Sequence, residues 1–178
     1  MFVLSLINFM TLPSTFLANK KDINAIIESP KGSSVKYTFD EKTELFQVSK
    51  LLPKGMVFPL HFGFIPSTKG EDGDPLDVLV LMDEPCYPGS LIEVRVIGAI
   101  EANQTEKNGK TVRNDRIIGA ALESSRYSQT TIKSLDKYLL DEVKNFFITY
   151  NAMANKKFTP LRQSNATTTI QLIKRHEI

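Results

Sequence analysis

The sequence contains few of the residues that build disulfides and zinc sites. It has one cysteine, Cys86, two histidines, His61 and His176, and no tryptophan among its 178 residues. A single cysteine excludes an intrachain disulfide and a cysteine-rich zinc site. Two histidines argue against a zinc site built from histidine. The chain must therefore be stabilised by an ordinary hydrophobic core, and any metal it binds is expected to have oxygen ligands.

The sequence also lacks an excess of charge of either sign. Lysine and arginine number 22 against 20 aspartate and glutamate residues, which gives a formal net charge of +2. This balance does not favour a protein that wraps a polyanion. Hydrophobic residues make up 42% and charged residues 24% of the chain, as is typical of a soluble globular protein. We expect a cytoplasmic protein with neither a membrane nor a nucleic acid as a partner.

No long hydrophobic run is present at the N-terminus. The apolar patches before residue 17 are interrupted by polar residues and by Pro13, and the first basic residue is Lys20. A secretory signal needs an early positive charge, and a membrane span needs about 20 apolar residues in succession. We therefore expect residues 1–20 to be a disordered N-terminal extension and residues 21–178 to form a single domain, since a domain averages roughly 150 residues.

Apolar and β-branched residues predict a series of short strands. These are residues 23–28, 35–39, 45–48, 76–82, 91–97 and 117–122. The unbroken apolar run within residues 76–82 is typical of a strand that is buried on both faces. Asn108-Gly109 indicates a hairpin turn, because both residues tolerate a positive φ. Residues 53–75 hold four prolines and four glycines, which predicts a looped segment. The spacing of the strands favours a small closed β-barrel.

One long helix is predicted near the C-terminus. Apolar residues recur at steps of three and four from Leu135 to Tyr150, and Ser134 is a suitable N-cap residue. The helix is expected to run to about Asn155. Residues 167–173 fit either a strand or a short helix.

The segment with the clearest chemistry is Glu71-Asp72-Gly73-Asp74-Pro75-Leu76-Asp77, directly before the buried strand. On an extended backbone Asp72 and Asp74 point to the same side, and Gly73 permits close approach of a neighbouring group. Pro75 restricts the backbone of Asp74. Carboxylates on a rigid backbone suit Mg²⁺, which keeps several of its waters for a substrate phosphate. The alternative is a solvated acidic turn without a ligand.

At this motif the chain resembles the soluble family I inorganic pyrophosphatases. Residues 72–78, Asp-Gly-Asp-Pro-Leu-Asp-Val, agree with the metal-binding motif of that family. The resemblance extends to residues 27–30 and 35–37, to Met56-Val57-Phe58-Pro59, to residues 62–66 and to residues 145–150 of the predicted helix, and covers roughly residues 22–158. It implies an α+β fold with a five-stranded OB-like β-barrel and a long C-terminal helix packed against it.

The resemblance also implies a role for individual residues. Asp72 and Asp77 would coordinate Mg²⁺, and Asp74 would act as the general base or orient the attacking water. Glu28 would hold metal-bound waters. Phosphate oxygens would be bound by Lys36, Lys50, Tyr150 and Arg116, of which Arg116 stands where the family has a lysine.

Several positions depart from the family pattern. Lys50 stands for an arginine, Phe58 and Phe62 for tyrosines, Thr38 for a glutamate and Asn151 for a lysine. Gln104 and Asn114 stand where the family has metal-binding carboxylates. Either the neighbouring Asp115 replaces a missing carboxylate through a register shift, which we expect, or the later metal sites are weaker.

The implied function is Mg²⁺-dependent hydrolysis of inorganic diphosphate to two phosphates by a homo-oligomer. Two metal ions can ionise a water and neutralise the leaving phosphate, and basic side chains stabilise the departing charge. One alternative is a catalytically weakened relative that binds phosphate or Mg²⁺. Another is an OB-type module for single-stranded nucleic acid, which would need aromatic stacking platforms in a basic groove.

Overall fold

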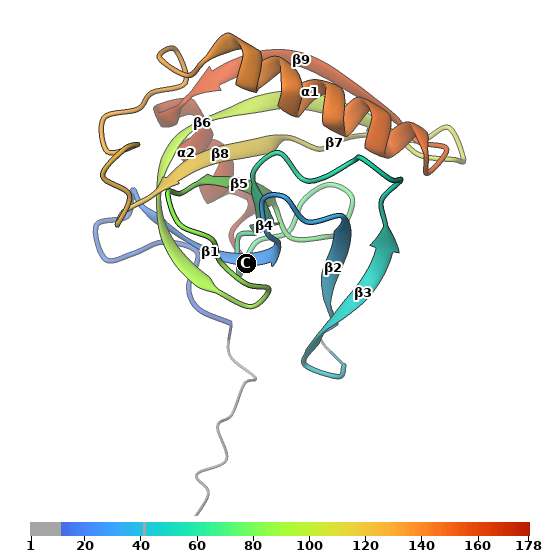
Figure 1. Cartoon of the computed structure of the whole chain (residues 1–178). Coiled ribbons are helices and arrows are strands. Elements are labelled where there is room, and N and C mark those ends of the chain that lie inside the picture. The colour runs from blue at the N-terminus through green and yellow to red at the C-terminus, as the bar shows by residue number, and fades with distance from the viewer. Residues whose placement is uncertain (1–11, 41) are drawn as a thin grey trace, which may run out of the picture.

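The computed structural model describes residues 12–40 and 42–178. Figure 1 shows a barrel of strands with one helix lying across it and a separate two-stranded hairpin beside it. The strands are β1 (Ile23–Ser29), β2 (Val35–Asp40), β3 (Leu45–Leu51), β4 (His61–Phe64), β5 (Asp77–Leu81), β6 (Leu91–Thr105), β7 (Thr111–Arg113), β8 (Arg116–Ala121) and β9 (Lys157–Asn165). The helices are α1 (Lys137–Ala152) and α2 (Ala166–His176).

Five strands close into a ring, which confirms the predicted barrel. β1 pairs with β4, β4 with β5, β5 with β8, β8 with β6, and β6 returns to β1. Only the β5–β8 pair of this ring is parallel. β6 is long enough, at 15 residues, to pair also with β7 and β9, so that these two strands extend the sheet beyond the ring. The hairpin of β2 and β3 forms a sheet of its own.

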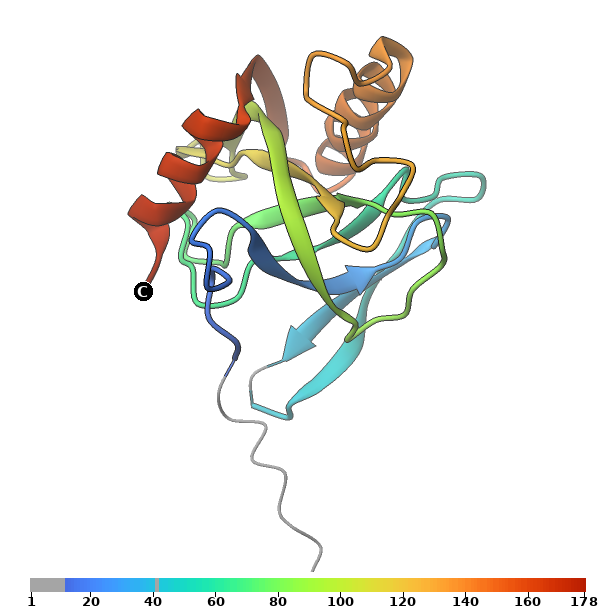
Figure 2. The same cartoon turned by 90° about the vertical axis from the view of Figure 1, so that its left-hand side faces the viewer.

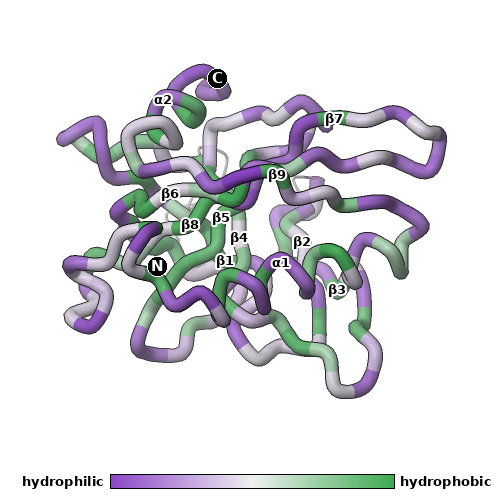
Figure 3. The backbone as a smooth tube through the Cα atoms, turned by 90° about the horizontal axis from the view of Figure 1, so that it is seen from above, coloured by the Kyte–Doolittle hydropathy of each residue, from purple (hydrophilic) through white to green (hydrophobic). Residues whose placement is uncertain are grey.

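β5 is buried on both faces, as its apolar run predicts. Val78 and Val80 contribute to one hydrophobic cluster, whereas Leu79 and Leu81 contribute to the other. Because successive side chains of a strand point to opposite faces, β5 joins both halves of the core. Figure 3 shows hydrophobic residues concentrated in the strands of the ring, β5 and β8 among them. The strand that begins at Asp77 is therefore held from both sides.

The predicted long helix is present but starts later and ends earlier than expected. Its N-cap is Asp136, whose side chain accepts a hydrogen bond from the backbone N–H of Tyr138. Ser134 does not cap the helix, because its hydroxyl bonds within a turn to Thr131. Leu140, Val143, Phe146 and Phe147 are buried and belong to the cluster that fills one half of the core. The apolar stripe thus packs the helix against the barrel, as expected.

Three strands, β4, β7 and β9, were not among those predicted, although the Asn108-Gly109 turn indicated a hairpin next to β7, and the type of α2 was left open. β4 lies inside residues 53–75, where the density of proline and glycine predicts only loops. β9 contains Pro160, and its nine residues pair with β6. Residues 167–173, which fit a strand or a helix, lie in α2. Figure 2 shows α1 and α2 at separate places on the barrel.

The described part of the predicted N-terminal extension is packed against the barrel. Thr15 is fully buried and its hydroxyl lies 3.1 Å from the carbonyl oxygen of Pro66. Phe16 forms a β-bridge with Ile23. The expectation of disorder up to residue 20 is therefore wrong for residues 12–20, and its remaining part lies outside the described residues. Within residues 12–40 and 42–178, no helix is long and apolar enough to cross a membrane.

Candidate active site

The acidic motif forms a tight loop before β5. The backbone N–H of Gly70 donates to the carbonyl of Asp74 at 2.7 Å, and that of Gly73 donates to the carbonyl of Gly70 at 3.1 Å. The hydroxyl of the buried Thr68 accepts from the N–H of Leu76 at 3.0 Å. Gly73 has a φ of +94°, and a Cβ placed there would meet nothing within 4 Å. Gly73 therefore supplies the left-handed backbone of the turn, and no described residue approaches it closely.

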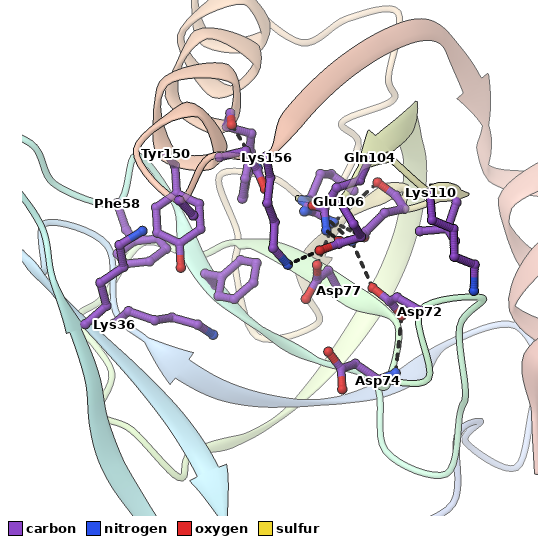
Figure 4. Close-up of a pocket in the computed structure, with 18 residues that line it drawn as sticks. Lys36, Phe58, Asp72, Asp74, Asp77, Gln104, Glu106, Lys110, Tyr150 and Lys156 are labelled. Carbon is purple, nitrogen blue, oxygen red and sulfur yellow. Dashed lines mark hydrogen bonds and ion pairs between the residues drawn. The ribbon is translucent and has the colours of Figure 1, made fainter. Parts of the chain in front are cut away.

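A cavity of ≈ 380 Å³ lies between this loop, the β2–β3 hairpin, the β6–β8 region and the end of α1 (Figure 4). Seven of the nine predicted site residues line it. These are Asp72, Asp74, Asp77, Lys36, Lys50, Arg116 and Tyr150. In Figure 4 the three aspartates come from the loop and the first residue of β5, and face Tyr150 and Lys36 across the opening. Carboxylates and cationic groups separated in sequence are thus brought to one cavity, which we call the cleft.

The deepest carboxylate of the cleft is paired with an arginine. Asp77 Oδ2 lies 2.5 Å from Nη1 of Arg116, the first residue of β8, which pairs in parallel with β5. The Arg116 side chain is 4% exposed, and its guanidinium also packs 4.5 Å from the ring centroid of Phe147. Burial raises the pKa of Asp77, although Arg116 and Lys36 oppose the change. The charge of Arg116 therefore does not fully offset the effect of burial on the pKa of Asp77.

Asp72 is held by neutral groups. Its Oδ1 accepts from the backbone N–H of Asp74 at 3.2 Å, and its Oδ2 accepts from the amide of Asn114 at 2.9 Å. Burial raises the pKa of Asp72, and the charges of Asp74 and Asp77 raise it further. Asn114 in turn accepts a hydrogen bond from Arg116 through its Oδ1. The Asn114 amide thus links Asp72 to Arg116, which is paired with Asp77. Asp72 and Asp77 are the two carboxylates that were predicted to share a metal ion.

Glu28 lies beside the cleft and not in it. Its Oε2 is ion-paired with Lys36, and its Oε1 accepts from the backbone N–H of Phe39 at 3.2 Å. It lines an adjoining cavity of ≈ 420 Å³, which Asp74 and Asp77 also line. The structure therefore places Glu28 near two of the motif aspartates, with its charge already matched by Lys36.

Asp115 is the one predicted site residue that lines neither the cleft nor the adjoining cavity. Its Oδ1 accepts from Arg113 Nε at 2.5 Å and from the backbone N–H of Ala102 at 2.8 Å. It lines a cavity of only ≈ 20 Å³ behind the loop. Asn114 lines the cleft in its place. The expected register shift is therefore absent, and the arrangement gives no support to Asp115 as a metal ligand.

Aromatic rings form the wall below α1. Phe58 packs against Phe62, Phe146 and Tyr150, with ring centroids 5.0–6.2 Å apart. Lys50 Nζ lies 4.5 Å from the centroid of Tyr150, and burial raises the pKa of the Tyr150 hydroxyl. The two phenylalanines that stand where the family has tyrosines thus serve as packing groups. A protonated Tyr150 is available as a hydrogen-bond donor.

Two lysines of the cleft, Lys110 and Lys156, were not predicted from the sequence. Lys110 follows the Asn108-Gly109 turn, so the hairpin signal could have placed it. Lys156 lies between α1 and β9 and has no local signal of its own. Its Nζ is 2.8 Å from Oε2 of Glu106, which also lines the cleft.

The donor set of the cleft fits a hard divalent cation. Asp72, Asp74 and Asp77 supply only oxygen atoms, and the raised pKa of Asp72 and of Asp77 shows that further positive charge would favour their ionised forms. In the described part of the chain, however, no group of three or more His, Cys, Asp or Glu side chains is already arranged to hold a metal ion. A metal ion bound through Asp72 Oδ2 would compete with the hydrogen bond that Asn114 donates to this atom.

The fold and the cleft define a class: proteins with a closed five-stranded β-barrel that carries carboxylates and amines around one cavity. The family model described as inorganic pyrophosphatase matches residues 25–177. Soluble inorganic pyrophosphatase 3 of Arabidopsis thaliana is 43% identical over 136 residues, which are 75% of this chain and 60% of the relative. The inorganic pyrophosphatase of Synechocystis is 36% identical over 135 residues, covering 75% of this chain and 77% of the relative.

Solved structures show the same likeness. The inorganic pyrophosphatase of Thermus thermophilus matches with a TM-score of 0.83 and 30% identity, covering 94% of this chain and 95% of that one. That of Neisseria gonorrhoeae matches with a TM-score of 0.83 and 25% identity over 95% and 96% of the two chains. The chain belongs to the inorganic pyrophosphatase family. It spans about three fifths of the length of the plant relatives that it matches.

Proposed function

We propose that this protein hydrolyses inorganic diphosphate to two phosphates in a Mg²⁺-dependent reaction. One observation carries the proposal: Asp72, Asp74 and Asp77 line a single cavity together with Lys36, Lys50 and Arg116. Carboxylates of this kind suit Mg²⁺, and amines and guanidinium suit phosphate oxygens. The names of the relatives agree with this chemistry. The location in the cytoplasm and the homo-oligomeric state stay predictions.

The metal would be held by Asp72 and Asp77, and Glu28 would act from the adjoining cavity on metal-bound water. Bound Mg²⁺ supplies positive charge that lowers the pKa of a water molecule and neutralises phosphate oxygens. Asp77 keeps a fixed position because it begins the buried strand β5 and is paired with Arg116. Asp72 becomes available once Asn114 releases it.

Asp74 is the residue to which we assign the proton transfer. Its side chain is exposed and faces the opening of the cleft, where a water can reach both it and the substrate. The carboxylate accepts a proton from the attacking water, whose oxygen forms the new bond to phosphorus as the bridging P–O bond breaks. The negative charge that develops on the leaving phosphate is stabilised by Lys36, Lys50, Arg116 and the Tyr150 hydroxyl.

A second candidate function is binding of diphosphate and Mg²⁺ with slow turnover. Gln104 and Asn114 offer neutral amides to the cleft, and Asn114 Nδ2 donates to Asp72. A neutral amide holds Mg²⁺ less firmly than a carboxylate would, since it contributes no charge. Binding of single-stranded nucleic acid is less well supported, because the aromatic rings near the cleft pack against one another below α1.

The test is release of phosphate from diphosphate with and without Mg²⁺, using the purified wild type, Asp74→Asn and the matched control Glu71→Gln. We expect the wild type to need Mg²⁺ and to lose activity with a chelator. Asp74→Asn should lower the rate about 10²–10⁴-fold, the contribution typical of general base catalysis. Glu71 is exposed on the same loop but does not line the cleft, so its variant should keep the wild-type rate.

The same measurements separate the alternatives. Diphosphate binding with Mg²⁺ but hardly any phosphate release would favour the weakened relative. Salt-sensitive binding of an oligonucleotide without Mg²⁺ would favour the nucleic-acid module. Undiminished hydrolysis by Asp74→Asn would refute the role of Asp74.

A further inference from the structure

One ion pair of the cleft is not used by the proposed chemistry. Lys156 Nζ lies 2.8 Å from Oε2 of Glu106, and both side chains line the cavity at the end of α1 (Figure 4). The other oxygen of Glu106 accepts from Nε2 of Gln104 at 2.6 Å. The pair therefore closes a short polar chain from β6 to the segment that follows α1.

The fold holds these two residues next to each other. Asn155 has a φ of +56°, and the N–H of Lys156 donates to the carbonyl of Asn151 at 3.0 Å, so that the chain turns back after α1. Lys157 then pairs with Thr105 in the β6–β9 register. Residues 156 and 106 are the immediate neighbours of that pair. The position of Lys156 is consequently set by the backbone and not only by its ion pair.

Asn151, at the same end of the cleft, offers no charge to an anion. Its side chain is buried, and its amide donates to the carbonyl of Phe147 at 2.9 Å. The other cations that line the cleft are Lys36, Lys50, Lys110 and Arg116, and none of them lies on α1 or on the segment that follows it. Lys156 is thus the cation that the end of α1 presents to the cavity.

We propose that Lys156 binds a phosphate group of the substrate and that Glu106 holds Lys156 in position until the substrate arrives. The inference rests on the proposed diphosphatase function. The side chains of Lys156 and Glu106 are 33% and 26% exposed, and ion pairs in such surroundings contribute little net stability. A diphosphate group carries more negative charge than one carboxylate, so exchange of Glu106 for a phosphate oxygen is favourable. Glu106 then acts as a competitor of the substrate for Lys156.

The hydrogen bond from Lys156 lowers the pKa of Glu106, so this carboxylate is ionised wherever the cleft binds diphosphate near neutral pH. A competing charge of this kind has a measurable consequence. Its removal strengthens binding of the anion, whereas removal of the lysine weakens it. A purely structural ion pair would respond to both changes in the same direction.

The experiment measures KM and kcat for diphosphate in Lys156→Gln, Glu106→Gln and the control Lys157→Gln. Lys156→Gln should raise KM roughly tenfold with a smaller change in kcat, as expected for one lost charge-assisted hydrogen bond. Glu106→Gln should lower KM about two- to fivefold, because an exposed pair restrains the lysine only weakly. Lys157 is exposed and lies outside the cleft, so its variant should behave as the wild type.

Binding of a methylene-bridged diphosphonate, which cannot be hydrolysed, gives a second measurement that needs no turnover. Calorimetry should show weaker binding in Lys156→Gln and tighter binding in Glu106→Gln. The inference is overturned if both variants shift in the same direction, if neither shifts, or if Glu106→Gln mainly raises the Mg²⁺ concentration required. A wild type that binds the diphosphonate but releases no phosphate would refute the proposed hydrolysis alone.

Discussion

Arg116 and Asp77 are paired at 2.5 Å although they come from strands that lie 39 positions apart in the sequence. The pairing follows from the parallel register of β5 and β8, in which Val78 faces Ile117. Each strand therefore presents its first residue at the same end of the barrel. The arginine is almost fully buried, and its Nε has no hydrogen-bond partner within the described residues. Arg116 thus depends on Asp77 for compensation of its charge.

We predict that Arg116→Gln lowers the free energy of unfolding by about 3 kcal/mol, at the low end for a broken buried ion pair because Asp77 is 23% exposed. Urea unfolding at pH 7 measures this change. The double variant Asp77→Asn/Arg116→Gln should recover part of the loss, since no charge is then left unpaired. Equal stability of the two variants would contradict this account, because removal of the unpaired Asp77 charge would then bring no gain. The rate of diphosphate hydrolysis should fall about 10²–10³-fold in Arg116→Gln.

Gly63 in β4 allows the barrel to close on β1. A Cβ at this position would lie 2.0 Å from the backbone oxygen of Ile26. Gly63→Ala must therefore push β1 and β4 apart, and we expect a loss of about 3 kcal/mol in the free energy of unfolding. Gly32→Ala is the control, because its Cβ would meet nothing within 4 Å and its positive φ costs only about 1–2 kcal/mol. Equal losses in the two variants would contradict this account.

Cys86 is expected to be an unreactive thiol. Burial raises the pKa of Cys86 to about 11, and its sulfur lies 3.0 Å from Nδ1 of His61. Because the thiolate is the reactive form, alkylation of the folded protein at pH 8 should be much slower than in urea, as measured by mass spectrometry. The thiol loses its proton more readily in the unfolded chain, so stability should fall as the pH rises above 9. Rapid alkylation of the folded protein would show that the site opens.

His61 should make the fold sensitive to mild acid. Burial, together with the charge of Lys31, lowers the pKa of His61 from 6.5, and Nδ1 accepts from the backbone N–H of Lys31 at 3.1 Å. Below pH 6.5 the unfolded chain takes up a proton that the folded chain resists. The free energy of unfolding should therefore decrease as the pH falls from 6.5 through the folded pKa.

Urea unfolding between pH 5 and pH 7.5 tests this expectation. His61→Gln should flatten the decrease. The control His176→Gln leaves His61 in place and should therefore keep the decrease in the free energy of unfolding that His61 causes. An unchanged pH profile in His61→Gln would assign the acid sensitivity to other groups.

Local patterns were sufficient for much of the fold. The apolar run of residues 76–82 predicts β5, because a strand that is buried on both faces is apolar throughout. The spacing from Leu135 to Tyr150 predicts α1, because a helix that packs on one face has apolar residues at steps of three and four. β4 was missed because Gly63 and the surrounding prolines resemble a loop. Gly63 is required because the backbone of β1 lies against it. This contact cannot be predicted from the sequence around residue 63.

The adjacent pair Asn114 and Asp115 shows where the site could not be predicted. Only the tertiary structure decides that Asn114 faces the cleft while Asp115 is turned toward Arg113. The residue types alone favoured the carboxylate as the metal ligand. Side-chain direction depends on the register of β6, β7 and β8, and a difference of one residue is enough to reverse it.

The acidic loop before β5 is determined by the local sequence, since Gly73 and Pro75 shape it through short-range backbone constraints. The residues that surround this loop in the folded protein are not determined locally. Arg116, Tyr150 and Lys156 reach it only because the ring of strands closes and α1 lies across it. Charges attract over distances in space and not along the sequence, so the electrostatics of the cleft could be known only after the chain was folded.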